Sequence, residues 1–413
     1  MRETKDSGLE WIGEIPAEWG LSKIGQVYRL RNTKVSDTDY PPLSVTNKGI
    51  VPQLDTAAKT NAHDDRKLVR KGDFAINSRS DRRGSCGISD YDGSVSLINT
   101  ILAPLGEMNP GYYDWLFHTV QFGDEFYKFG HGIVDDLWTT GWQDMKKITI
   151  PTPPLAEQRC IADFLDAKCA EFDALTADIQ IQIDTLEQYK RSVITETVTK
   201  GLNPDAEMKD SGIEWIGNMP AHWDVIRGKY ILRYMQKPVR EDDGVITCFR
   251  DGEVTLRSNR REDGFTMSDK EIGYQGIDVG DLVVHGMDGF AGSIGISDSR
   301  GKASPVLNVL DTDQCKRYIM YYLRSMAYSD VFLALATGIR VRSCDLRWNK
   351  LAELSYPVPP LDEQNAIVKH IDSVLSKADA VIADKKAQLA TLDEYKKSLI
   401  FEYVTGKKEV PVS

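Results

Sequence analysis

Apolar residues recur at seven-residue intervals along residues 155–199, a segment without proline or glycine. Two more, Leu175 and Tyr189, each fall three positions after a member of that series. A seven-residue repeat predicts a helix that packs lengthwise against another helix. Pro154 suits its first turn and Gly201 its left-handed end. At about 68 Å, it would be longer than a compact domain needs, so we interpret it as a spacer. The series is Leu165, Phe172, Ile179, Leu186 and Val193.

A second segment, residues 361–405, is equally long and also lacks proline and glycine until Gly406. Its apolar stripe is less regular, because Lys385 stands where the first segment has Ile179. We expect the two helices to pack antiparallel against each other, although each could instead join a separate bundle or pair with another molecule. The stripe comprises Val374, Leu375, Val381, Ile382, Leu389, Leu392, Tyr395 and Leu399. The matches at an offset of 206 are PPLAEQ (153–158) with PPLDEQ (359–364) and TLEQYKRSVI (185–194) with TLDEYKKSLI (391–400).

The remainder of the chain repeats as well. KDSGLEWIGEIPAEW (5–19) recurs as KDSGIEWIGNMPAHW (209–223), and we expect its tryptophans to pack in a core. Residues 71–90 align with residues 279–298 at an offset of 208. In each, a Gly-Asp turn precedes a strand (FAIN or LVVH), a loop (78–83 or 286–291) and a second short strand. Residues 131–155 align with 337–361 in the same way.

These patterns predict an α+β protein built from two copies of one plan. Each copy has a mixed, strand-rich globular domain followed by a long helix. The globular domains are predicted over residues 1–150 and 205–356, and the spacer helices with their flanks over residues 151–204 and 357–413. The internal repeat predicts a pseudo-two-fold relation between the copies.

Composition is typical of a globular protein, with 41% hydrophobic residues in a chain of 413. No apolar run is long enough to cross a membrane and no signal peptide opens the chain. The six cysteines show neither CxxC nor Cys/His metal spacing. We therefore expect a cytoplasmic, reducing environment.

The net charge of −11 at first disfavours a nucleic-acid partner. Nine acidic and four basic residues give −5 over residues 155–199, and eight and six give −2 over residues 361–405. Most of the negative charge therefore belongs to the helices. A local basic patch can still bind a phosphate backbone, because salt screens charges beyond about 10 Å.

No motif points to catalysis. Walker A, GxGxxG, HExxH and the Asn-Pro-Pro-aromatic tetrapeptide of amino-methyltransferases are all missing, and the six histidines are scattered. Residues 204–209 (PDAEMK) resemble the PD…ExK pattern of nucleases, but the carboxylates lie in one linker instead of on separate strands. We expect no catalytic residue, metal or cofactor on this chain.

Arginine clusters are the best candidates for a binding site. Guanidinium groups can pair bidentately with guanine or hold phosphates. The alternative is that they are solvated or paired with Asp81, Asp251 or Glu262, and with Asp345 for the last pair. The candidate DNA-binding residues are Arg79, Arg82, Arg83, Arg250, Arg257, Arg260, Arg261, Arg340 and Arg342.

The paired motifs GLEWIGEIPAEW/GIEWIGNMPAHW and PPLAEQ/PPLDEQ resemble the specificity subunit of type I restriction-modification systems across the whole chain. The resemblance implies two target recognition domains, each reading half of a bipartite double-stranded DNA site, with the helices as a fixed spacer. It also implies two modification subunits as partners, and S-adenosylmethionine, ATP and magnesium on the modification and restriction subunits. One departure is that HGIVDDLW lacks the arginines of GIRVRS, so a DNA contact by residues 131–138 stays open.

Two other functions remain to be weighed. A coiled-coil adaptor would bind proteins through its globular domains, and sequence-specific, salt-sensitive DNA binding would distinguish the two. A self-contained DNA-modifying enzyme is disfavoured because its motifs are missing, and a methyl-transfer assay of the purified chain would test it.

Overall fold

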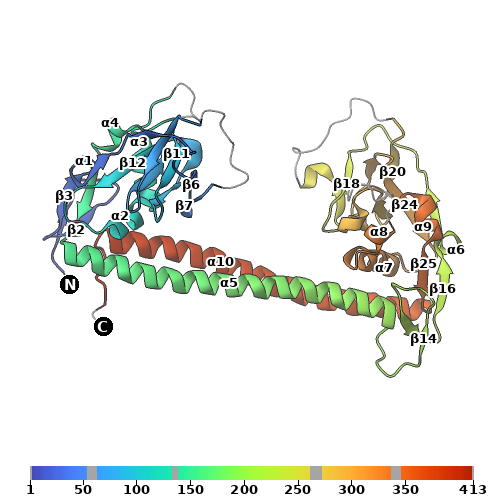
Figure 1. Ribbon diagram of the computed structural model, residues 1–413. Coiled ribbons are helices and arrows are strands. Elements are labelled where there is room, and N and C mark those ends of the chain that lie inside the picture. The colour runs from blue at the N-terminus through green and yellow to red at the C-terminus, as the bar shows by residue number, and fades with distance from the viewer. Residues whose placement is uncertain (1, 54–62, 133–137, 261–271, 336–345, 412–413) are drawn as a thin grey trace. The chain divides into compact units, whose positions relative to one another are not determined.

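The computed structural model describes residues 2–53, 63–132, 138–260, 272–335 and 346–411 (Figure 1). The chain divides into two compact units. Unit 1 comprises Met1–Ile179 with Lys386–Ser413, and unit 2 comprises Gln180–Lys385. Within the described residues, no helix is both long and apolar enough to cross a membrane.

Two long helices contribute to both units, as the heptads predict. Helix α5 spans Leu155–Lys200 and helix α10 spans Leu361–Val404. In unit 1, Phe164 packs on Tyr403 with ring centroids 4.5 Å apart, and Phe172 packs on Tyr395 at 5.6 Å. Since the partner number falls as the α5 number rises, the helices run antiparallel there, as expected.

The register of the seam corrects one prediction. Leu175 and Tyr189 are 47% and 51% exposed, and on α10 Val381 and Tyr395 are also exposed. The buried positions four places after Leu165 and Ile179, which are Cys169 and Ile183, belong to the seam instead. Spacings of three and four residues both lie on one helix face, so sequence periodicity alone does not choose between them. Between residues 165 and 186, the apolar α5 positions that are buried or half-buried are Leu165, Cys169, Phe172, Ile179, Ile183 and Leu186.

Unit 1 is built on a four-stranded antiparallel sheet in the order β10-β9-β12-β4. The strands of unit 1 as a whole are β1 (Thr4–Asp6), β2 (Glu14–Pro16), β3 (Gly20–Lys23), β4 (Tyr28–Leu30), β5 (Lys34–Val35), β6 (Leu43–Thr46), β7 (Gly49–Pro52), β8 (Arg66–Val69), β9 (Phe74–Asn77), β10 (Cys86–Ile88), β11 (Gly93–Ser96), β12 (Asn99–Pro104) and β13 (Thr149–Thr152). Its short helices are α1 (Ile24–Val27), η1 (Ser80–Arg82), α2 (Pro110–Phe117), α3 (Val120–Lys128) and α4 (Trp142–Met145).

Unit 2 repeats this plan with the sheet order β17-β24-β21-β22. Its strands are β14 (Met208–Asp210), β15 (Asn218–Pro220), β16 (Asp224–Arg227), β17 (Leu232–Met235), β18 (Ile246–Cys248), β19 (Val254–Leu256), β20 (Gln275–Ile277), β21 (Leu282–His285), β22 (Ile294–Ile296), β23 (Gly301–Ala303), β24 (Leu307–Thr312) and β25 (Ser355–Val358). Its short helices are α6 (Gly228–Ile231), η2 (Arg257–Asn259), η3 (Gly289–Ala291), α7 (Lys316–Tyr328), α8 (Val331–Ala334) and α9 (Trp348–Glu353).

The repeat holds at the level of strand register. Asn99 pairs with Asn77 in unit 1, and Leu307 pairs with His285 in unit 2. Both residues of the second pair follow those of the first at the offset of 208. The strands FAIN and LVVH and the loops that follow them are therefore confirmed.

The glutamine of each PPLxEQ motif ties a long helix to its sheet domain. Gln158 is buried, accepts from the Asn109 backbone N–H at 2.9 Å and donates to the Pro153 carbonyl at 2.8 Å. Gln364 makes the same bonds to Cys315 and Pro359, both at 2.9 Å. Each motif recurs because a buried amide needs both partners.

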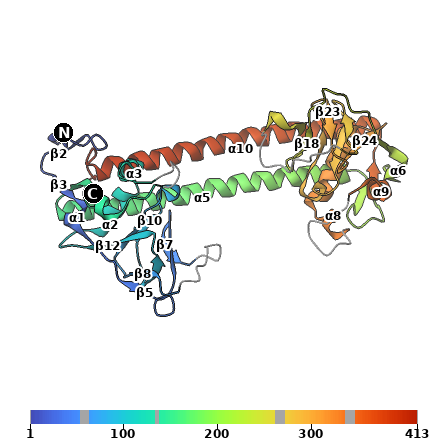
Figure 2. The same ribbon diagram turned by 90° about the horizontal axis from the view of Figure 1, so that it is seen from above.

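The far end of each helix is held in a matching way. The Tyr112 hydroxyl donates to the Val404 carbonyl at 2.7 Å in unit 1, and Tyr318 donates to Val198 at 3.0 Å in unit 2. Gly406 then turns with φ of 72°, and a Cβ there would lie 2.9 Å from Trp19. The ends of the chain accordingly lie side by side in unit 1, where the Lys407 ammonium donates to the Ile12 carbonyl (Figure 2).

Both tryptophans that close the repeated motif are core residues, as expected. Trp19 and Trp223 are fully buried, and the Trp19 indole donates to Glu157 at 2.9 Å in the first turn of α5. An aromatic cluster of unit 1 surrounds Trp19, and α7 supplies most of the matching core in unit 2. The motif is therefore architectural.

Candidate nucleic-acid interface

The predicted arginines of unit 1 lie on the loop between β9 and β10, at η1. Arg79 and Arg82 share the Asp81 carboxylate at 3.2 and 3.8 Å. Arg83 pairs with Asp124 at 2.8 Å and lies 5.0 Å from the centre of the Tyr127 ring. The loop thus gathers three cations, and each has a carboxylate partner.

Of the predicted arginines of unit 2, Arg250 lies in the loop between β18 and β19, Arg257 begins η2 and Arg260 follows it. Arg250 pairs with Asp288 at 3.0 Å. Arg260 pairs with Asp251 at 2.7 Å and lies 4.2 Å from the centre of the Phe249 ring. Arg257 places its Nε 3.5 Å from the Thr247 hydroxyl.

Three predicted residues, Arg261, Arg340 and Arg342, lie outside the described residues. Residues 133–137, which form most of the 131–138 stretch considered for DNA contact, also lie outside the described residues. Glu262 and Asp345, two of the proposed partners, also fall there. The structure therefore brings together Arg79, Arg82 and Arg83 in one unit, and Arg250, Arg257 and Arg260 in the other.

The ion pairs weighed as an alternative are present for Arg79, Arg82 and Arg260. They are weak partners, because exposed pairs contribute only about 0–1 kcal/mol. The side chains of Arg82 and Arg250 are 67% and 65% exposed. A phosphate can therefore replace either carboxylate at little cost.

A cleft of about 560 Å³ opens beside the arginines of unit 2. Its charged lining comprises three arginines and two aspartates, and its apolar lining includes Phe249 and Leu307. Arg250 also borders a second cleft of about 720 Å³, where Lys190 and Arg191 of α5 and Arg324 of α7 supply further cations. Because acids and bases nearly balance, neither cleft is a simple anion trap.

A cross-strand row of His285, Leu307 and Ser293 lies in the first cleft. His285 on β21 pairs with Leu307 on β24, and its backbone N–H donates to the Ser293 carbonyl at 3.0 Å. Residues opposite one another in antiparallel strands place their side chains on one face. The cleft is lined by all three residues.

Sequence reasoning did not identify His285 or Ser293. The signal was present, since His285 ends the predicted strand LVVH and Ser293 begins the matched GSIGIS segment. Their shared position in the cleft results from cross-strand pairing and burial, and a linear sequence pattern specifies neither. Burial lowers the pKa of His285 from its usual 6.5, Asp288 opposes this shift and Arg250 adds to it.

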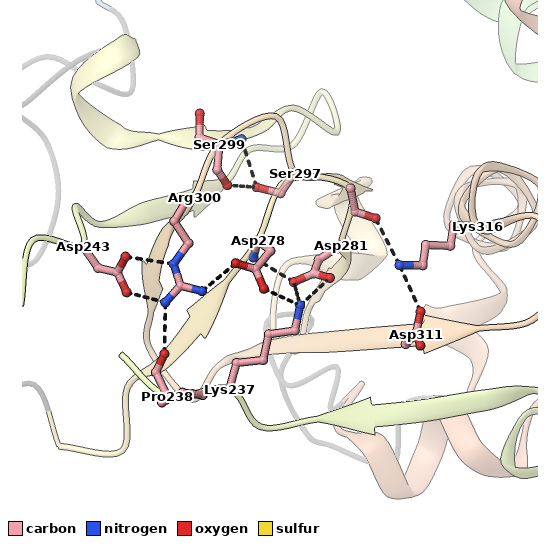
Figure 3. Close-up of polar contacts among 11 residues, drawn as sticks. Lys237, Pro238, Asp243, Asp278, Asp281, Ser297, Ser299, Arg300, Asp311 and Lys316 are labelled. Atoms are coloured by element: carbon pink, nitrogen blue, oxygen red, sulfur yellow. Dashed lines mark hydrogen bonds and ion pairs between the residues drawn. The ribbon is translucent and has the colours of Figure 1, made fainter. Parts of the chain in front are cut away.

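An ion-pair network lies at the start of β21, the opposite end of that strand from His285. Arg300 pairs with Asp243 at 2.7 Å and with Asp278 at 2.6 Å, and Lys237 links Asp278 to Asp281 (Figure 3). Hydrogen bonds from Lys237 and Arg300 lower the pKa of Asp278 to about 2. The network joins the ends of β17, β20 and β21 with the turn before β23.

Unit 1 has a counterpart with one pair reversed in charge. At the offset of 208, Arg70 and Asp92 correspond to Asp278 and Arg300, and Arg70 pairs with Asp92 at 2.8 Å. The attraction between the two positions is kept while each residue changes sign. The repeat therefore preserves the contact and not the residues.

Metal-binding clusters and cysteine thiols are the remaining candidates for chemistry in the described part of the chain. No cluster of three or more His, Cys, Asp or Glu side chains there is arranged to hold a metal ion. Of the described cysteines, Cys86, Cys169 and Cys248 are buried, and burial raises the pKa of Cys248 to about 12.

Comparisons with known proteins address the fold and family. Residues 16–185 match the model of the type I restriction modification DNA specificity domain. The chain is 26% identical over 280 residues to a putative type I restriction enzyme specificity subunit, MjaX, of Methanocaldococcus jannaschii. That match covers 64% of this chain and spans 60% of the relative's length. The MjaVIII specificity subunit of the same organism is 24% identical over 77% of this chain and 76% of its own length.

A solved structure supports the same fold. A chain from a structure of complex assembly and conformational transition of the type I restriction-modification system superposes with a TM-score of 0.69 at 14% identity. The match covers 95% of this chain and 99% of that one. The α+β fold, with its repeated sheet domains and two long helices, and the sequence matches therefore agree. Residues 16–185 thus match the type I restriction modification DNA specificity domain, and the chain is similar to named specificity subunits of type I restriction enzymes.

Proposed function

We propose that the chain is the sequence-specific DNA recognition subunit of a type I restriction-modification complex. Residues 1–150 and 205–356 are its target recognition domains, and each reads one half of a bipartite target. Residues 151–204 and 357–413 carry the spacer helices. The observation that supports this division most is that the two units keep one strand register while the side chains on matched positions differ.

The arginine clusters are proposed as the DNA contacts. Arg79, Arg82 and Arg83 serve the first half-site, and Arg250, Arg257 and Arg260 serve the second. Arg261, Arg340 and Arg342 are proposed with them from the sequence alone. The side chains of Arg82, Arg83 and Arg250 are 67%, 61% and 65% exposed and their ion pairs are weak, so a phosphate or a guanine can replace the carboxylate partner.

Two modification subunits are proposed as protein partners, docked on the long helices. Exposed apolar side chains on those helices support this, since each keeps more than 40% of its surface open to solvent within the described chain. Methyl transfer, ATP use and cleavage would belong to the partner subunits, together with S-adenosylmethionine, ATP and magnesium, in a cytoplasmic complex. The exposed side chains are Leu175, Ile181, Tyr189, Val381 and Tyr395.

Methylation mapping tests this function. The genome of the host is sequenced for methylated bases with the gene present and with it deleted. We expect a single bipartite motif to lose its methylation on deletion. An unchanged methylation pattern, together with salt-insensitive and sequence-independent DNA binding, would favour the coiled-coil adaptor instead.

A further inference from the structure

Ser293 carries a buried polar group with nothing to bond. The residue is 1% exposed, and its hydroxyl has no hydrogen-bond partner within the described chain. A buried, unpaired hydroxyl costs free energy that a fold normally avoids. Unlike the unpaired hydroxyl of Tyr28 in the core of unit 1, the Ser293 hydroxyl belongs to a residue that lines a cleft, where a partner from outside the chain can complete its bonding.

His285, the cross-strand neighbour of Ser293, offers a second donor. Its Nδ1 accepts from the backbone N–H groups of Met287 and Asp288 at 3.2 and 2.9 Å. In the neutral ring the proton must then be on Nε2. Nε2 lies 3.9 Å from the Asp288 carboxylate, beyond hydrogen-bond distance.

The matched row in unit 1 has the same property with different chemistry. There Asn99, Asn77 and Ser85 replace Leu307, His285 and Ser293. Asn99 is 4% exposed, and its side-chain oxygen has no hydrogen-bond partner in the described residues. Each unit thus leaves one buried polar atom unpaired in the same cross-strand row, and the two rows carry different donors and acceptors.

We propose that this row is a nucleobase-contacting site, and that Ser293 and His285 are specificity-determining residues of unit 2. The inference rests on the proposed function and adds the residues that read a base. Two adjacent donors fit a base edge with two acceptors, such as the O6 and N7 atoms of guanine. A neutral hydroxyl and a neutral imidazole N–H suit an uncharged base edge, whereas a phosphate would be bound by the arginines that line the same cleft.

The test uses the methyltransferase assembled from this chain and its modification subunits. Ser293→Ala removes the unpaired hydroxyl, and His285→Asn keeps the turn, since Asn77 accepts from Arg79 at 3.1 Å in the same position of unit 1. Ser297→Ala is the matched control, because that buried hydroxyl already donates to the Ser299 carbonyl at 2.9 Å. Binding is measured to the mapped target and to duplexes with one base pair changed, at several salt concentrations.

We expect Ser293→Ala and His285→Asn to lower the preference at one base pair of one half-site by about tenfold to a hundredfold. The melting temperature of Ser293→Ala and the salt dependence of binding should stay unchanged, and Ser297→Ala should keep the preference. Even weakening across all duplexes with a smaller salt slope, or no change in binding, would overturn the inference alone. A wild-type complex without sequence preference would overturn the proposed function as well.

Discussion

The Tyr112 hydroxyl shows how single groups hold this fold together. It is buried in an aromatic cluster of unit 1 and satisfies the carbonyl of Val404 in the last turn of α10. The four last carbonyls of a helix have no partner within the helix, so an outside donor is valuable there. Tyr28 lies in the same cluster, but its hydroxyl has no hydrogen-bond partner in the described residues.

Two matched substitutions separate these tyrosines. Tyr112→Phe should lower the free energy of unfolding by about 1–3 kcal/mol, because the Val404 carbonyl stays buried without its donor. Tyr28→Phe should be neutral or stabilising, since it removes a hydroxyl that bonds to nothing. Chemical denaturation of both variants measures the difference. Equal losses would show that the Tyr112 bond does not hold the helix end.

At the scale of elements, the sequence predicts the long helices well and their seam less well. Proline, glycine and the heptads define α5 to within one residue of its observed end. Whether the residue three or four places after a heptad member is buried in the seam depends on the partner helix, which the pattern of one helix does not specify. Ile183 is 5% exposed and Ile181, two residues earlier on the same helix, is 62% exposed.

The two isoleucines provide a controlled test of the seam. Ile183→Asp places a charge in the packed face of unit 2 and should cost several kcal/mol, about 3–5 by analogy with an unpaired buried charge. Ile181→Asp should change stability by less than about 0.5 kcal/mol. The measurement is the free energy of unfolding of each variant. A destabilised Ile181→Asp variant and an unaffected Ile183→Asp variant would show that the packed face contains Ile181 and not Ile183.

The ion-pair networks allow the same position to be compared in both units. Arg300 holds Asp243, whose side chain is 2% exposed, whereas Arg70 and Asp92 are 45% and 50% exposed. Arg300→Met should therefore cost about 3–5 kcal/mol by leaving a buried charge unpaired. The equivalent change in unit 1, Asp92→Asn, should cost far less, because both partners of that pair are exposed.

The pH dependence of this pair has a definite sign. The hydrogen bond from Arg300 lowers the pKa of Asp243 from its usual 3.8. The resulting stabilisation is present above pH 3.8 and is lost as the pH falls through the folded-state pKa. Denaturation of the wild type and of Arg300→Met between pH 6 and about 3 measures it. Curves that stay parallel over that interval would contradict the assignment.

At the scale of the whole molecule, the repeat is what the sequence reveals most clearly. Offsets near 206 predict two copies of one plan, and the strand registers at an offset of 208 confirm it. The arginine clusters were also visible in the sequence. The cleft, the unpaired hydroxyl of Ser293 and the charge-reversed pair were not, because each depends on contacts between strands that are distant along the chain.

The central claim is that each half of the chain reads its own half of one DNA target. Replacing residues 1–150 with the equivalent domain of a related specificity subunit tests this most directly. The readout is the methylated motif in cells that carry the hybrid chain and the unchanged partner subunits. We predict that one half of the motif changes while the other half and the spacing stay the same. A change in both halves, or in neither, would contradict the account.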